Sequence, residues 1–285
     1  FIPIEQEQAA AALARLALSN SETQIAIAKG GGISPLISML DSETNAPAAQ
    51  EFAAACVAEL ALVGLNRDTI VRNSAITPLV ALLREGRNDG KKFAASALAR
   101  LAHEQDSTAA AIAEAGSISP LVGLLRGDRG EAAQEEAAGA LFELAANKGN
   151  RIAITDCDGI GPLVVLLGSE NPRTREHAEG ALVRLSIETS NRVLIIKQLV
   201  AMLYDSGKEQ AAAALANLAS DSDGNRVSIV EAGGIRPLLE LLDNSTSAKS
   251  KENALIAITH LAHSNLERQA AIADAGGVPR IVEVL

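Results

Sequence analysis

Apolar residues recur along this chain at spacings of three and four, in stretches that return at a regular interval. Examples are AAALARLAL, ASALARLAH, AGALFELAA and AAALANLAS. On a helix this spacing gathers the apolar side chains on one face, which is typical of an amphipathic helix packed against a core. The pattern predicts seven such long helices, in phase. Their inward-facing leucine pairs are expected to be Leu13/Leu16, Leu98/Leu101, Leu141/Leu144, Leu182/Leu185 and Leu215/Leu218.

A second pattern, a small residue or Gly followed by Ile or Val and then Pro, predicts a sharp turn between two shorter helices. GGISPLISML and GSISPLVGLL are examples. Gly suits a left-handed cap at the end of a helix, and Pro is tolerated in the first turn of the next one. The apolar anchors of this turn are Ile33, Ile76, Ile118, Ile160, Ile235 and Val278, spaced 43, 42, 42, 75 and 43 residues apart.

The interval of 75 residues contains one shortened unit, because two complete units would span roughly 84 residues at the observed period. Its remnant, IIKQLVAML, has lost both the Gly turn and the Pro, and the loop that follows it (YDSGKEQ) is also short. Either this unit carries true deletions, or flexible residues are missing from the sequence. The pattern leaves both alternatives open.

Each unit, with a short helix, a Gly turn, a second helix, a loop and a long third helix, resembles the armadillo repeat of importin-α, β-catenin and vacuolar armadillo proteins. HEAT repeats are the nearest alternative, but they have two helices and lack the Gly-Gly-Ile-x-Pro turn. The resemblance covers the whole chain and implies an all-α, right-handed superhelical solenoid. We expect one array over 1–285, part of a longer protein: the end of one repeat (1–20), full repeats at about 21–64, 65–105, 106–147, 148–189, 190–222 and 223–264, and a partial repeat (265–285).

The resemblance also implies that the third helices line a concave groove. The residue before the second Leu of each third helix points away from the core, and in peptide-binding members it is typically Asn, whose amide can hold the backbone of an extended ligand. Only Asn217 matches, and the Trp that importin-α carries four residues earlier is replaced by Ala213 and its equivalents. The column reads Arg15, Glu59, Arg100, Glu143, Arg184, Asn217 and His260. From Arg15 to Arg184 the charges alternate, which indicates either a ladder of ion pairs between neighbouring repeats or a chance alternation of solvated side chains.

Further candidates for the groove lie about two turns before this column: Phe52, Phe93, Glu136 and His177. Phe52 and Phe93 occupy equivalent positions in neighbouring repeats. They form either a hydrophobic anchor site or ordinary core beneath the next helix. Beside them runs a mostly acidic column, which either steers a basic ligand or follows the helix dipole.

Composition restricts the partners. Aromatic residues make up 2% of the chain and hydrophobic residues 48%, so the core must consist of Ala, Leu, Ile and Val. A net charge of −10 argues against nucleic acid and anionic membranes, and no apolar run is long enough to predict membrane insertion. Two cysteines, Cys56 and Cys157, form no disulfide framework and favour a reducing compartment. We expect a cytoplasmic protein, with the nucleus as a second location.

Nothing in the sequence predicts catalysis, a metal or a cofactor. Only His260 and His263 lie close together among the four histidines, and the Gly-rich turns lack the Lys-Ser/Thr of a phosphate loop. We therefore expect a scaffold, not an enzyme, that binds a protein or peptide segment of mixed or basic charge along the concave groove. The alternatives are the substrate-recognition region of a larger armadillo-containing ubiquitin ligase of the U-box type and a nuclear-transport adaptor.

Overall fold

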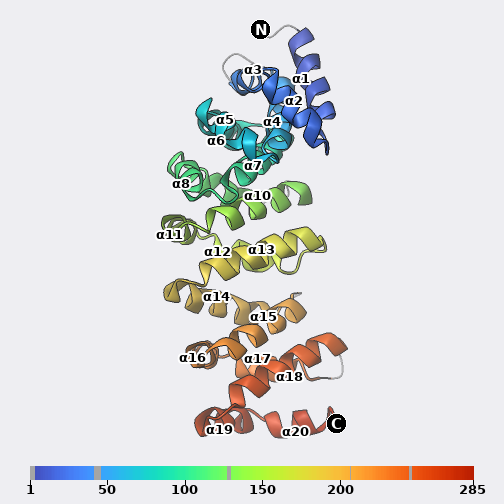
Figure 1. Ribbon diagram of the computed structural model, residues 1–285. Coiled ribbons are helices and arrows are strands. Elements are labelled where there is room, and N and C mark those ends of the chain that lie inside the picture. The colour runs from blue at the N-terminus through green and yellow to red at the C-terminus, as the bar shows by residue number, and fades with distance from the viewer. Residues whose placement is uncertain (1–3, 42–45, 127–129, 206, 244–245) are drawn as a thin grey trace. The chain divides into compact units, whose positions relative to one another are not determined.

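The computed structural model describes residues 4–41, 46–126, 130–205, 207–243 and 246–285 (Figure 1). Ser206, in the short loop of the shortened unit, lies outside these residues. Throughout the described ranges the regular elements are α-helices, and none is a strand. The chain divides into two compact units, unit 1 (Phe1–Gly159) and unit 2 (Ile160–Leu285).

Unit 1 follows the predicted order of a short, a second and a long third helix. Its third helices, α1, α4, α7 and α10, pack directly against one another in succession. The helices of unit 1 are α1 (Ile4–Ala17), α2 (Ser21–Lys29), α3 (Ile33–Ser38), α4 (Pro47–Leu60), α5 (Gly64–Arg72), α6 (Ile76–Glu85), α7 (Asn88–Ala102), α8 (Asp106–Glu114), α9 (Ile118–Leu125), α10 (Glu131–Leu144) and α11 (Lys148–Asp156).

Unit 2 has the same order except at one point, where a single helix, α14, replaces the first two helices of a repeat. Its third helices are α13, α15 and α18, and the last two pack directly against each other. The helices of unit 2 are α12 (Ile160–Leu166), α13 (Pro172–Leu185), α14 (Thr189–Met202), α15 (Lys208–Asp221), α16 (Asp223–Glu231), α17 (Ile235–Glu240), α18 (Ala248–Ala262), α19 (Leu266–Asp274) and α20 (Gly277–Val282).

The predicted turn between first and second helices is confirmed. In each one a residue adopts a left-handed backbone conformation, and the amide of the next residue often closes the turn, as from Gly234 to the Ile229 carbonyl at 2.9 Å. A Cβ on Gly234 would lie 2.8 Å from Cγ2 of Ile229, so this position needs Gly for space as well. The left-handed residues are Gly31, Ser74, Gly116, Asp158, Gly233 and Gly276.

In most repeats a buried side chain ties the first helix to the end of the third helix before it. Asn150 donates from Nδ2 to the carbonyls of Leu144 and Ala109, both at 3.0 Å. Each of these asparagines is followed by an arginine that donates to the next carbonyl, as Arg151 does to Ala145 at 3.2 Å. The asparagines are Asn66, Asn150, Asn191 and Asn225. This Asn-Arg corner satisfies carbonyls that the helix itself leaves unpaired.

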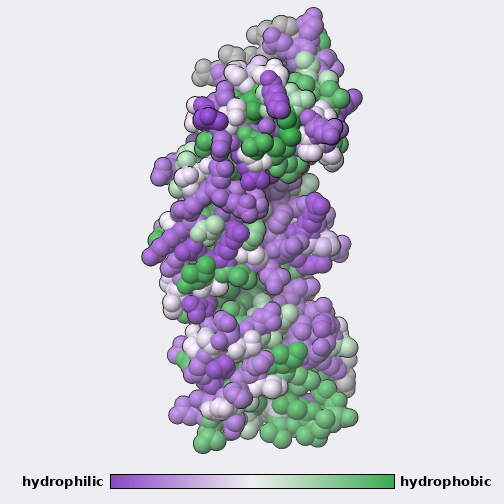
Figure 2. Space-filling view, in the orientation of Figure 1, coloured by the Kyte–Doolittle hydropathy of each residue, from purple (hydrophilic) through white to green (hydrophobic). Residues whose placement is uncertain are grey.

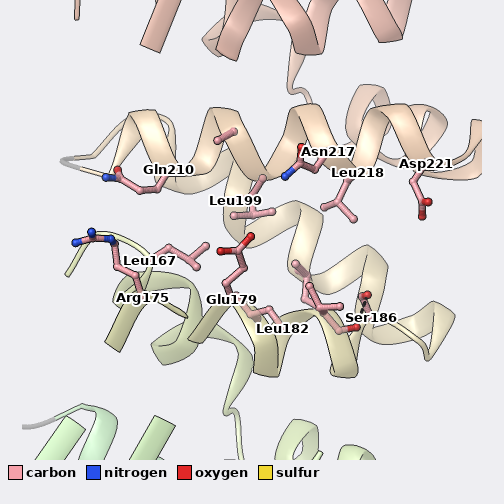
Figure 3. Close-up of a pocket in the computed structure, with 14 residues that line it drawn as sticks. Leu167, Arg175, Glu179, Leu182, Ser186, Leu199, Gln210, Asn217, Leu218 and Asp221 are labelled. Carbon is pink, nitrogen blue, oxygen red and sulfur yellow. Dashed lines mark hydrogen bonds between the residues drawn. The ribbon is translucent and has the colours of Figure 1, made fainter. Parts of the chain in front are cut away.

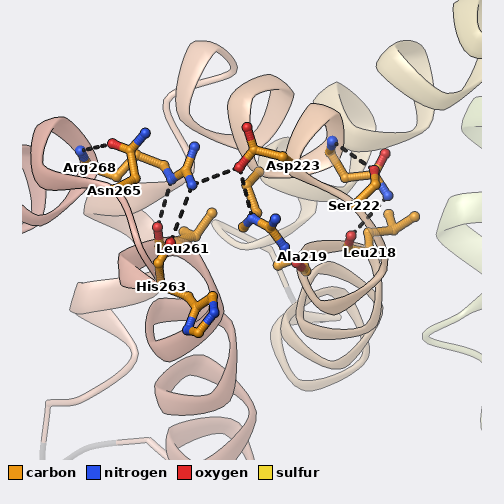
Figure 4. Close-up of polar contacts among 10 residues, drawn as sticks. Leu218, Ala219, Ser222, Asp223, Leu261, His263, Asn265 and Arg268 are labelled. Carbon is orange, nitrogen blue, oxygen red and sulfur yellow. Dashed lines mark hydrogen bonds and ion pairs between the residues drawn. The ribbon is translucent and has the colours of Figure 1, made fainter.

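At the corner between α18 and α19, Arg268 takes the place of the asparagine (Figure 4). Its Nε donates to the Leu261 carbonyl at 2.7 Å, and its Nη2 lies 2.8 Å from a carboxylate oxygen of Asp223. Arg226 contacts the same oxygen of Asp223 at 3.2 Å. Asp223 therefore joins two successive corners of unit 2.

The expected leucine core is confirmed in α7, α10 and α13, with corrections in α1 and α15, where Leu13 and Leu218 are half-buried. Leu98, Leu101, Leu141 and Leu144 are buried, but the side chain of Leu16 is 58% exposed. Helix α1 packs against α2 and α4, and its Leu16 side faces neither of them. Sequence spacing could not reveal this, because it identifies an apolar face without saying which neighbours cover it.

The surface turned to the viewer in Figure 2 is mostly hydrophilic, with apolar side chains gathered over α20. Val278 and Val282 are each 58% exposed there. No individual helix in the described ranges has both the length and the apolar composition needed to cross a bilayer. The bent pair α8 and α9, at 85° to each other, passes that test on length and composition alone.

Candidate protein-binding groove

The shortened unit folds as one continuous helix. Without a Gly turn or a Pro, the segment runs unbroken through α14, and α15 begins 36 residues after α13, whereas α18 begins 40 residues after α15. Helix α14 packs against α12, α15 and α16. Its residues Ile195, Ile196 and Leu199 are buried, so this one helix supplies the core side chains that two helices supply elsewhere.

This replacement leaves a groove between α13 and α15. Over Pro172–Leu185 and Lys208–Asp221, which the structure describes in full, these two third helices lack the direct packing that joins α15 to α18. The space between them has a volume of about 440 Å³. Figure 3 shows it bounded by α13 on one side and α15 on the other, with α14 behind.

The floor of the groove is apolar. Ile195 and Leu199 of α14 reach it from behind, with 3% and 1% of their surfaces exposed, and Leu182 of α13 lies beside them. Ala214 and its neighbours on α15 form the opposite wall, and their small side chains leave the space open. Val183 of α13 lines the edge and is 63% exposed, so apolar surface continues from the floor to the solvent.

The rim of the groove is polar, and much of it has no partner. In Figure 3, Gln210 and Arg175 lie at one end, Asp221 lies at the other, and Glu179 and Asn217 lie between them. Arg175 donates from Nη1 to the backbone carbonyls of Ser169 and Glu170, at 2.6 and 2.9 Å. For the other four side chains, no hydrogen bond or ion pair occurs among the residues that the structure describes.

Of the residues predicted to bind a partner, only Asn217 lines this groove. It is exposed, as its place in the column requires. His177, Arg184 and His260 of unit 2 are half-buried and lie outside the groove lining. The sequence contained the signal for the groove, namely the missing Gly turn, but not its consequence for the distance between α13 and α15.

In unit 1 the predicted ladder of ion pairs is mostly wrong. One step forms, between Nη1 of Arg100 and Oε1 of Glu59 at 3.0 Å. Arg15 is exposed and makes no ion pair with Glu59, whose other oxygen accepts the backbone N–H of Ser19 at 3.4 Å. Arg100 likewise makes no pair with Glu143.

Glu143 instead contacts Nδ1 of His103 at 2.8 Å. His103 caps the end of α7, so it reaches the Glu143 side chain from the corner between repeats. Within unit 1 the column therefore forms one step of the expected ladder and one contact from Glu143 to the corner between repeats, which spacing along the sequence could not distinguish from a continuous ladder.

The second row of candidates is half-buried. Phe52, Phe93 and Glu136 all have intermediate exposure, so neither the open anchor nor the ordinary core describes the two phenylalanines fully. The ammonium group of Lys92 lies over the ring of Phe93, 4.2 Å from the ring centroid. Burial and the neighbouring Asp89 raise the pKa of Glu51, which lies in the adjacent acidic column.

The described residues include no cluster of three or more His, Cys, Asp or Glu side chains that could hold a metal ion. Cys56 and Cys157 are free thiols. Burial, with a smaller contribution from Glu59, raises the pKa of Cys56 to about 12. A thiol with such a pKa is not a nucleophile at neutral pH.

Comparison with known proteins identifies the repeat. Residues 106–146, 147–187 and 222–263 match the family model of the armadillo/β-catenin-like repeat, and the shortened unit lies between the last two matches. The structure of an engineered protein from a structural genomics consortium is 33% identical, with a TM-score of 0.71, over 98% of this chain and 69% of that one. The chain belongs to the armadillo-repeat family, and its fold is the all-α armadillo solenoid.

Two further structures share the fold at lower identity. A designed armadillo repeat protein in complex with the peptide (KR)4 is 22% identical, with a TM-score of 0.59, over 91% of this chain and 95% of that one. A structure from work on the interaction between cadherin and β-catenin is 19% identical, with a TM-score of 0.69, over 97% of this chain and 53% of that one. A comparison with curated protein sequences gives no significant match.

Proposed function

We propose that this chain is a protein-interaction scaffold that holds a segment of a partner protein against its third helices. The observation that carries the proposal is the row of charged and amide side chains at equivalent positions of successive third helices. Similar folds act in this way, since one designed relative binds the peptide (KR)4 and another structure concerns cadherin and β-catenin. Their identities of 22% and 19% support the class of function and do not specify the ligand.

The charges along the third helices favour a partner of mixed or basic charge. Arg100 is already paired with Glu59, so part of the column is neutralised within the protein, and Glu143 is in contact with His103. The chain as a whole carries a net charge of −10. A basic segment would gain from this field, whereas nucleic acid would be repelled by it.

We also propose that the chain has no catalytic activity and acts in a reducing, cytoplasmic environment. The armadillo fold is typically a binding scaffold, and the family model that matches this chain describes a structural repeat and no enzyme. Both cysteines are unpaired, and the one with a raised pKa is buried. A reducing compartment is where free thiols of this kind persist.

The test is a selection of peptides from a phage-displayed library of random dodecapeptides on the purified chain. Synthetic copies of the selected peptides are then titrated by fluorescence anisotropy against the double variant Arg100→Glu, Arg184→Glu. We expect affinity to fall by about tenfold or more, equivalent to about 1.4 kcal/mol, with an unchanged helical circular-dichroism signal. The control is Glu114→Arg, an exposed change on the first helix α8, which should leave affinity unaltered. Binding that responds only to Glu114→Arg would place the ligand on another surface and refute the proposal.

A further inference from the structure

We propose that the groove between α13 and α15 is an anchor site for one apolar side chain of an extended peptide, next to a lysine or arginine of that peptide. The inference rests on the proposed scaffold function and adds where the segment is held and what its chemistry is. It depends on the shortened unit, because this is where two successive third helices of unit 2 stand apart and leave a groove floored by the helix behind them.

The floor determines the anchor. Its volume of about 440 Å³ lies within the range of about 300–1,000 Å³ that is usual for ligand pockets. Leu182, Ile195 and Leu199 form an apolar base, and Val183 extends it to an exposed edge. An aliphatic or phenyl side chain placed there would bury its own apolar surface and part of the exposed Val183 side chain, and none of these four residues offers a polar group to a charged occupant.

The amides determine the backbone conformation. Gln210 and Asn217 are seven residues apart on α15, so they lie two turns apart on one face, roughly 10 Å along the helix axis. An extended peptide covers this distance in about three residues. Each amide has a donor and an acceptor without a partner among the described residues, so each can pair with a peptide N–H or C=O on either side of the anchor.

The carboxylates determine the charge of the neighbouring residue. Glu179 faces the middle of the groove and Asp221 lies at one end (Figure 3), and neither has an ionic partner in the described part of the chain. The cation on the rim, Arg175, lies at the other end and already donates to two carbonyls. A basic side chain next to the anchor, on the Asp221 side, would meet two unpaired carboxylates.

The groove is tested with Ala214→Trp, which fills it from the α15 wall. The probe is the pool of random dodecapeptides selected on the wild-type chain and counter-selected on this variant. Peptides retained only by the wild type should be enriched in Leu, Ile, Met or Phe adjacent to Lys or Arg. Their affinities should fall at least about tenfold on Ala214→Trp, which corresponds to loss of one buried apolar anchor. If Ala214→Trp has a lower thermal midpoint than the wild type, Val183→Asp at the exposed edge is used in its place. The same peptides should lose affinity on Val183→Asp, which does not fill the floor.

The charge requirement is tested with the double variant Glu179→Lys, Asp221→Lys. Peptides selected on it should lose the basic neighbour and gain Asp or Glu in its place, while the apolar anchor remains. The matched control is Glu176→Lys, an exposed change on α13 that does not line the groove, and it should preserve the wild-type preference.

Three results would overturn the inference. The first is a peptide pool with no apolar-basic pattern, and the second is unchanged affinity on both Ala214→Trp and Val183→Asp. The third is loss of affinity only on the Arg100→Glu, Arg184→Glu variant, which would refute the groove and leave the scaffold function standing. A selection that retains no peptide at all would contradict both proposals.

Discussion

At the scale of single residues, the turn between first and second helices shows how far local sequence determines conformation. The left-handed position is Gly31, Gly116, Gly233 or Gly276 in four turns, and these were predictable because Gly adopts positive φ without a steric penalty. Ser74 and Asp158 adopt the same conformation, with φ of 62° and 55°. Their positions follow from the repeat and not from their own preferences, so here the period of the sequence overrides residue type.

We predict opposite effects of two substitutions at this position. Ser74→Gly removes a left-handed strain of about 1 kcal/mol, partly offset by the greater freedom of Gly in the unfolded chain, and should stabilise the protein by about 0.5 kcal/mol. Gly233→Ala meets no atom within 4 Å, so its cost is conformational and should be about 1 kcal/mol. Urea denaturation followed by circular dichroism measures both. A loss of stability in Ser74→Gly would mean that the Ser74 side chain has a role that its exposed position does not suggest.

Asp223 gives a second prediction at this scale, in the pH dependence of stability. Its hydrogen bond from Arg268, and then that from Arg226, holds the pKa of this exposed carboxyl below its ordinary value. The folded state therefore binds this proton less readily than the unfolded state. The stabilisation is fully present above the unfolded value of about 3.9, and it is lost as pH falls through the lower folded value.

Asp223→Asn should consequently lower the thermal midpoint at pH 7, and the difference from the wild type should shrink only below about pH 3.9. Asp221→Asn is the matched control, because this exposed carboxylate two residues earlier has no partner in the described structure. Differential scanning fluorimetry between pH 7 and pH 3 measures both variants. Equal midpoints for Asp223→Asn and Asp221→Asn at pH 7 would show that the contact between the two corners adds no stability.

At the scale of the helices, the repeating pattern predicted each element of the regular repeats but not what joins them. The apolar period and the Gly turn gave the three helices, because both are encoded locally. The Asn-Arg corner was missed, although NR recurs four residues before a buried Ile, as in NRIAI at Asn150. In a sequence, polar residues at the start of a helix are normally interpreted as facing solvent. Only the packed structure shows that Asn150 and Arg151 are buried against backbone carbonyls.

The Asn-Arg corner leads to a prediction that compares Asn150 with Asn191. Asn150 donates to two carbonyls at 3.0 Å, one of them in the preceding repeat, whereas Asn191 donates to a single carbonyl, that of Leu185, at 3.3 Å. Asn150→Ala removes two buried hydrogen bonds and should cost roughly 2 kcal/mol, while Asn191→Ala removes one and should cost about 1 kcal/mol. Urea denaturation of both variants makes the comparison. An equal loss would show that the bond to the preceding repeat at Ala109 contributes nothing.

At the scale of the whole molecule, the regular repeats were predictable from the sequence. The shortened unit was also predictable, but the groove that it leaves between α13 and α15 was not. The lost Gly turn and Pro identified the shortened unit from sequence alone. Whether α13 and α15 would close over it or stand apart depends on packing between distant residues, such as Leu182 with Leu199, which no local pattern encodes. The candidate groove thus lies where the repeat fails, and of the predicted binding residues only Asn217 belongs to it.

The last prediction restores the regular repeat. Replacing residues 191–207 with a copy of 66–87 supplies a complete first helix, left-handed turn and second helix, and adds five residues at the point where the spacing of third helices is short. Because complete repeats bring successive third helices of unit 1 into direct contact, α13 and α15 should then pack at roughly 10 Å. Spin labels at Glu179→Cys and Asn217→Cys, in a Cys157→Ser background, should move closer together by double electron–electron resonance.

The same replacement should abolish selection of apolar-basic peptides while leaving the loss of affinity on Arg100→Glu unchanged, because Arg100 belongs to unit 1. The control carries the labels in the unmodified chain, where the distance should stay long. A graft that folds, keeps the longer label distance and still selects such peptides would show that the loss of the Gly turn is not what opens the groove. The separation of α13 and α15 would then have to arise from the facing surfaces of those two helices, where Ala213 and Ala214 oppose Glu179 and Val183 across the groove.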